Sequence, residues 1–156
     1  MTVDTLELTD SFLQEAQAVM GCDPDIPMHY RILCKLNQEN ELDTAKRFLE
    51  ANRALFQGRY AYLVLQSAVE MCLNLVADEN GTVYRDSQTL PKEHIYRPAP
   101  AETEYIAYLL RNGADPRLPE QFDQYEHLAD MEQDCSHQCG VRFDLSEIRA
   151  LFDKYC

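Results

Sequence analysis

The segment Glu104-Tyr-Ile-Ala-Tyr-Leu-Leu-Arg-Asn-Gly-Ala-Asp-Pro116 decides the fold more than any other part of this chain. Its apolar residues recur at helical spacing and form one face of a helix: Tyr105, Ile106, Leu109 and Leu110. Asn112-Gly113 predicts the end of that helix, because glycine accepts the left-handed backbone needed just past a helix terminus. Asp115-Pro116 then turns the chain away, since proline does not continue a helix. We therefore predict a helix over 101–112.

Apolar residues at the same spacing predict further helices along the chain. They lie at about 9–20, 29–37, 41–56, 60–77 and 119–134, with a last helix after Asp144. Cys135 to Gly140 is expected to break the helix before it. Asn80-Gly81 is typical of a hairpin turn and Thr82-Val-Tyr84 of a short strand, and the Pro-rich segment 86–100 reads as irregular.

These patterns predict a single all-α domain over 1–156. Its parts are a helical region 1–77, an irregular connection 78–100 and a further helical region 101–156. Two architectures fit the pattern: a helical repeat, or an irregular helical bundle with one Pro-rich irregular segment.

Residues 104–116 resemble the second helix of an ankyrin repeat and its Gly-Ala-Asp turn. The last helix repeats this pattern, because Ile148, Leu151 and Phe152 take the places of Ile106, Leu109 and Leu110. His127-Leu-Ala129 is similar to part of the signature of the first helix of such a repeat. The resemblance implies degenerate ankyrin-like helix pairs in 101–156, and a protein that binds other proteins without performing chemistry.

Composition limits the class of protein. Apolar residues make up 46% of the 156 residues and charged residues 26%, as in folded globular proteins. No apolar run is long enough for a membrane span, and the N-terminus lacks the features of a secretory signal. We expect the six cysteines to be reduced thiols. These features together favour a cytoplasmic location without membrane contact.

The charge is strongly negative and unevenly distributed. The net charge is −13, of which residues 1–30 carry −6 and residues 101–156 carry −7, whereas acids and bases balance in 31–100. Nucleic acid and anionic membranes would repel such a protein. We therefore expect no direct binding of nucleic acid and, instead, a partner protein with a basic surface.

Five acidic residues form a stripe along the helix predicted at 119–134. Spacings of three and four residues place them on one helix face, and no Lys or Arg occurs between Arg117 and Arg142. Tyr125 lies beside the stripe and offers contact area at low entropic cost. A solvated helix face is the simpler interpretation, and a docking stripe the functional one. The candidate partner-binding residues are Glu120, Asp123, Glu126, Asp130, Asp134 and Tyr125.

The docking stripe predicts a non-catalytic interaction module, either an inhibitor or an adaptor that docks on a basic surface of its partner. Alternatively, the module is a mimic of nucleic acid. Acidic phage inhibitors of host nucleases, of the anti-CRISPR or anti-restriction class, act in that way, and the partner would then be a nucleic-acid-binding enzyme. Here this link rests on charge alone.

Cys135-Ser-His-Gln-Cys139 is the remaining chemical candidate. Zinc prefers nitrogen and sulfur ligands, so Cys135, His137 and Cys139 are weak metal candidates that His127 and Cys156 would complete. Structural zinc sites use two separated ligand pairs, however, and this is one cluster. The sequence has no nucleophile motif and no phosphate-binding glycine loop. We therefore expect neither an enzyme nor a cofactor, and a zinc- or thiol-dependent protein is the further alternative.

Overall fold

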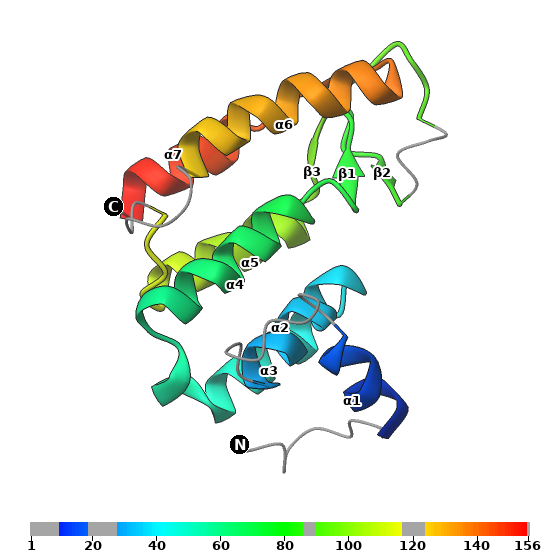
Figure 1. The fold of residues 1–156 in the computed structure, drawn as a ribbon. Coiled ribbons are helices and arrows are strands. Elements are labelled where there is room, and N and C mark those ends of the chain that lie inside the picture. Colours follow the sequence, from blue (N-terminus) through cyan, green and yellow to red (C-terminus); the bar gives the residue numbers. More distant parts are fainter. Residues whose placement is uncertain (1–9, 19–27, 86–89, 117–123, 156) are drawn as a thin grey trace.

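The computed structural model describes the chain except for residues 1–9, 19–27, 86–89, 117–123 and 156. Helices dominate the described part, and a small mixed sheet accompanies them (Figure 1). The helices are α1 (Asp10–Gln17), α2 (Met28–Gln38), α3 (Leu42–Ala51), α4 (Gly58–Glu70), α5 (Pro100–Arg111), α6 (Gln124–Cys139) and α7 (Ser146–Tyr155). A short 3-10 helix spans Arg53–Leu55, and the strands are β1 (Val76–Ala77), β2 (Val83–Tyr84), β3 (Ile95–Pro98) and β4 (Arg142–Phe143).

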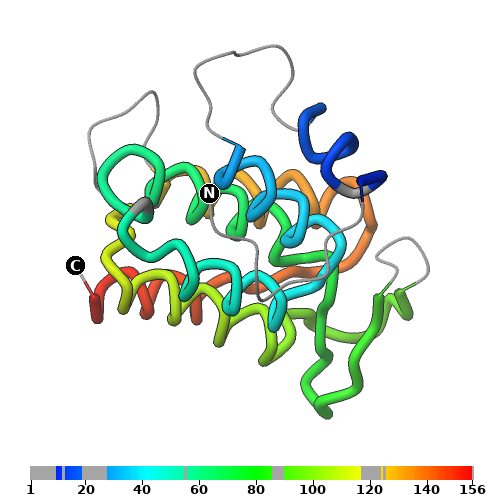
Figure 2. The backbone as a smooth tube through the Cα atoms, turned by 90° about the horizontal axis from the view of Figure 1, so that it is seen from below, coloured from blue at the N-terminus to red at the C-terminus, as the bar shows by residue number. Residues whose placement is uncertain are grey.

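The helices after α1 stack in two rows. In one row α2 packs on α4 and α4 on α6, and in the other α3 packs on α5 and α5 on α7 (Figures 1 and 2). Neighbours across the rows also pack, α2 on α3 and α4 on α5. The α4–α5 layer is therefore central, which agrees with the broad apolar surface of the α4 sequence.

The main core lies between these layers. Phe48 of α3, Leu65 of α4, Leu109 of α5 and Phe152 of α7 are fully buried in it, and Leu128 joins them from α6. Burying large apolar side chains from every layer is the main favourable term that holds such helices together.

The helix that the opening segment predicts is confirmed as α5. Its predicted apolar residues are all buried. Gly113 takes a positive φ of 106° just past its end, where the amide of Ala114 donates to the carbonyl of Leu109 at 3.1 Å. This hydrogen bond closes the last turn of α5, and such bonds are common where a helix ends at a glycine.

The described part of the chain is mostly helical, as predicted, but it also contains a small sheet that the all-α prediction did not include. Its strand order is β2-β1-β3-β4, with β1 antiparallel to β2 and β3, and β3 parallel to β4. The helix predicted over 60–77 ends at Glu70, because Val76–Ala77 pairs with two other strands instead. Segment 86–100, predicted as irregular, contributes β3. The hairpin prediction at Asn80-Gly81 is confirmed, since Gly81 has a φ of 84° and β2 follows it.

Two helix boundaries also differ from the prediction. The helix predicted over 41–56 ends at Ala51 and is followed by the 3-10 turn. The predicted break at Cys135 is wrong, because α6 continues to Cys139. Gly140 ends α6 instead, with a φ of 67° and its amide bonded to the carbonyl of Ser136 at 3.0 Å. The predicted start of this helix at Pro119 lies outside the described residues.

A second, smaller core lies between the sheet and α6. Tyr96 of β3 and Phe143 of β4 are buried in it, together with Val76 of β1, and the C-terminal half of α6 packs over them. The sheet thus supports one end of α6 while the helical layers support the other. Among the described helices, none combines the length and the apolar character needed to cross a membrane.

Candidate docking surface

The two faces of α6 differ sharply in character. The inner face is buried or partly buried at helical spacing and consists of Gln124, Leu128, Met131, Cys135 and Cys139. Gln124 Nε2 donates to the carbonyl of Tyr62 in α4 at 3.3 Å, which fixes the N-terminal end of α6. Cys135 and Cys139 pack against the second core at the other end. The helix is thus held along its whole length.

The outer face of α6 carries three of the five predicted stripe residues. Glu126, Asp130 and Asp134 are all exposed and follow one another at four-residue intervals, about 6 Å apart along the helix axis. We call these three residues the acidic stripe. Glu120 and Asp123 lie outside the described residues, as does the side chain of Tyr125.

No described basic side chain neutralises the acidic stripe. The ion pairs of the described chain engage other carboxylates, such as Glu15 and Glu39 with Lys35, and Glu147 with Arg97. Like charges at four-residue spacing oppose helix formation by a few tenths of a kcal/mol per pair. The packing of the inner face, rather than the stripe itself, therefore stabilises α6.

Glu132 anchors α6 to the start of α7. Its carboxylate accepts hydrogen bonds from Arg149 Nη2 at 2.6 Å and Nη1 at 3.3 Å. It also accepts one from the amide of Leu145 at 2.6 Å, immediately before α7 begins. One carboxylate thus caps α7 and pairs with its guanidinium group, which is a strong charge-assisted arrangement.

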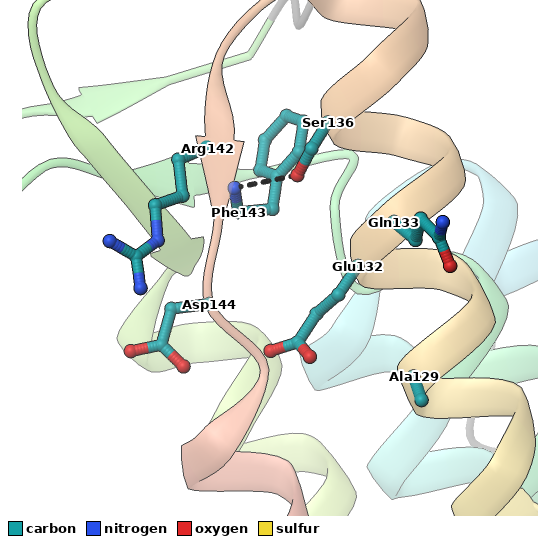
Figure 3. A pocket seen from close by; sticks show the side chains of 7 residues that line it. All are labelled: Ala129, Glu132, Gln133, Ser136, Arg142, Phe143 and Asp144. Atoms are coloured by element: carbon teal, nitrogen blue, oxygen red, sulfur yellow. Dashed lines mark hydrogen bonds between the residues drawn. The ribbon is translucent and has the colours of Figure 1, made fainter.

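A second link joins α6 to β4. Ser136 Oγ accepts a hydrogen bond from the amide of Phe143 at 3.0 Å, and Figure 3 shows this contact beside Glu132. Both links come from the same side of α6, so the helix is fixed in rotation as well as in position. The acidic stripe therefore points outward in a defined direction.

An open groove runs beside these links, with a volume of about 400 Å³. It is lined by Ala129, Glu132, Gln133, Ser136, Arg142, Phe143 and Asp144 (Figure 3). Its carboxylates already have partners. Asp144 Oδ1 accepts from the amide of Ser146 at 2.9 Å, and this bond lowers the pKa of Asp144. Both carboxylates of the groove are therefore engaged in hydrogen bonds within the protein.

The described candidates for a metal site do not converge on one point, and Cys156 lies outside the described residues. Cys135 and Cys139 share the inner face of α6, whereas His137 is exposed. A two-residue step rotates a side chain by about 200° around a helix, so His137 projects away from both thiols. His127 lies 3.6 Å from Glu70 of α4. Within the described ranges no three His, Cys, Asp or Glu side chains form a metal-binding group.

Burial also argues against a reactive thiol at this position. It raises the pKa of Cys135, with the neighbouring Cys139 adding to the shift. A thiol needs a lowered pKa to act as a nucleophile or redox group near neutral pH. Cys135 packs against the second core as a partly buried side chain.

Two polar features escaped sequence reasoning. His94, the residue before β3, places its Nδ1 atom 2.6 Å from Oε1 of Glu79 in the turn between β1 and β2, and this carboxylate raises the pKa of His94. Glu102, in the first turn of α5, is only 2% exposed. The Asn80-Gly81 turn predicts that Glu79 lies in a hairpin. No sequence pattern predicts the contact between Glu79 and His94 or the burial of Glu102.

Comparison of the chain with protein family models, curated proteins and solved structures found no match. The ankyrin-like relationship therefore stays a prediction from sequence.

Proposed function

We propose that this protein is a non-catalytic interaction module, an inhibitor or adaptor that docks through α6 on a basic surface of a partner protein. The observation that carries the proposal is the contrast between the two faces of α6. The inner face is anchored by packing and by Glu132, whereas the outer face presents the acidic stripe without a described counter-ion. Because the backbone of α6 is already fixed and the described residues form no ion pair with these carboxylates, docking on Lys or Arg side chains would require neither folding of the helix nor loss of a described ion pair.

The charge density of the stripe favours a protein partner over strict mimicry of nucleic acid. Three carboxylates at about 6 Å intervals are far sparser than the one charge per 1.7 Å of duplex DNA. A mimic of a phosphate backbone would need the acids at Glu120 and Asp123, and those of residues 1–30, on the same surface. A nucleic-acid mimic that inhibits a nuclease is therefore the more demanding form of the proposal, because it requires these additional acids.

We further propose that α5 and the α6–α7 pair are degenerate ankyrin-like helices, as the resemblance of residues 101–156 implies. Support comes from the two rows of stacked helices, in which α4 and α6 share one row and α5 and α7 the other. Repeat proteins of this kind stack helix pairs and bind partners over an extended face. A reducing, cytoplasmic setting fits the free thiols at Cys34, Cys72, Cys135 and Cys139.

A comparative pull-down tests the docking proposal. The baits are the wild type, a stripe variant (Glu126→Gln, Asp130→Asn, Asp134→Asn) and a control variant (Asp43→Asn, Glu93→Gln, Glu104→Gln). Both variants lose three negative charges, but the control residues are exposed acids outside α6. We expect a protein that the wild type and the control retain at low salt, and that the stripe variant loses. If all three baits retain the same proteins, the stripe is only a solvated face.

A further inference from the structure

Glu102 is a buried carboxyl group for which the described part of the chain shows no hydrogen-bond donor. It is 2% exposed, and its Oε1 atom is buried with no hydrogen bond. Its position as the third residue of α5 is where a carboxylate often bonds back to the amide before the helix. Here the amide of Ala99 donates to the carbonyl of Leu75 at 2.9 Å instead, so this capping bond is not made.

Among the residues that the structure describes, no positive charge compensates Glu102. The titratable groups that interact with it are Cys72, which follows α4, and Tyr105 of α5, and Cys135 of α6 faces Cys72. All three are neutral at physiological pH, and burial is the cause that raises the pKa of Glu102 to about 7. An ionised carboxylate at this position would be buried without a hydrogen bond or a counter-ion, which is strongly unfavourable.

An open groove adjoins the position. It has a volume of about 230 Å³, and Ala101, the residue before Glu102, lines it. Arg85 lines the same groove, together with the carboxylates of Glu41 and Asp43. Fraying of the first turn of α5 would therefore bring Glu102 into water close to a guanidinium group, although the two acids weaken that attraction.

We propose that Glu102 is a proton-dependent latch that keeps the first turn of α5 packed against α4 only while its carboxyl group is protonated. The folded state then binds a proton that the unfolded state releases more readily. Stability from this group is complete below the usual pKa of 4.5 and is lost as the pH rises through about 7. Proton release thus loosens the junction between the helical layers and the sheet.

The test compares urea unfolding at pH 5.5 and pH 8 for the wild type, Glu102→Gln and Glu104→Gln. Glu104 is an exposed acid on the same helix and serves as the matched control. With a pKa of about 7 when folded and 4.5 when unfolded, linkage gives an increase of about 25-fold in the unfolding equilibrium constant over this interval. We expect Glu102→Gln to lack this increase and Glu104→Gln to retain it. The pKa of His94 is also raised, by its hydrogen bond to Glu79, but its contribution to the pH dependence is common to all three proteins.

The same pH dependence in Glu102→Gln and the wild type would overturn the proposal. If Glu102→Gln does not fold, Glu102→Met takes its place, with the same expected loss of the increase. Hydrogen exchange of the wild type provides a second measurement. The first-turn amides of α5 should open more at pH 8 than at pH 5.5, after correction for intrinsic exchange, and α7 should not. Equal changes in both helices would contradict a local latch.

Discussion

The contact of Glu132 with α7 makes the most specific prediction about how the acidic stripe is held. Replacing Glu132 by Ala removes the acceptor for the amide of Leu145 and for both Nη atoms of Arg149. A hydrogen bond to a charged group contributes about 1.5–3 kcal/mol. The side chains of Arg149 and Glu132 are 34% and 24% exposed, so water partly replaces the lost contacts. We expect a net loss of about 2 kcal/mol, or roughly 30-fold in the folding equilibrium.

Urea unfolding followed by circular dichroism measures this loss. Glu126→Ala is the control, because Glu126 lies on the same helix but is exposed and outside the described ion pairs. It should change stability by less than about 0.5 kcal/mol. A double-mutant cycle with Arg149→Met should return a coupling energy of about 1 kcal/mol. A Glu132→Ala protein as stable as the control, or a coupling energy near zero, would refute the anchoring role of Glu132.

Three further predictions follow from other contacts. The carboxylate of Glu79 raises the pKa of His94, so this pair stabilises the fold at acidic pH and its contribution disappears as the pH rises through the raised value. Melting curves at pH 6 and pH 8.5 should therefore differ less in Glu79→Gln than in the wild type, and an unchanged difference would exclude the pair as a pH-dependent contact. Phe152 is fully buried, and Phe152→Ala should destabilise the protein by about 3–5 kcal/mol in urea unfolding; a loss below about 1 kcal/mol would contradict its place in the core. Gly113 has a φ of 106°, and no atom lies near the position of an added Cβ. Gly113→Ala should therefore destabilise the protein by about 1 kcal/mol through backbone strain alone. No change in the free energy of unfolding in the same assay would show that the turn tolerates alanine.

The long helices were predictable because their signal is local. In α5 the apolar spacing and the glycine past the helix end both lie within one segment, and the structure confirms both. The last helix is equally clear from Ile148 and Phe152, which are fully buried. Such segments report their own periodicity, so the sequence alone is sufficient to predict them.

The sheet was not predictable in the same way. The turn signal at Asn80-Gly81 predicted β2, but β1 and β4 have two residues each, which is too short to show an alternating pattern. Their pairing joins segments far apart in the chain, and Val76–Ala77 continues an apolar run that reads as helix. Tertiary contact therefore overrides local preference at this point. At Cys135 the prediction failed in the other direction. Polar residues indicated a break in the helix, but packing against the second core extends α6 through this segment.

The candidate surface was partly predictable. Carboxylates at helical spacing predicted an exposed acidic face, and Glu126, Asp130 and Asp134 are exposed on α6. The contact that holds this face in place could not be predicted, because the sequence does not show that Glu132 differs from the neighbouring acids. Its role depends on α7, which packs beside it in the folded chain. Burial of Glu102 is equally non-local, since a carboxylate in a first helical turn normally faces water.

The salt dependence of binding tests the central claim most directly. The partner captured by the wild type is titrated with the wild type, the stripe variant and the control variant between 50 and 300 mM salt. Docking through the acidic stripe predicts that the affinity of the wild type and of the control falls by about tenfold or more, because salt screens exposed charges. The stripe variant should bind weakly at low salt, and its affinity should change little as the salt concentration rises. Parallel curves for all three proteins would contradict the account.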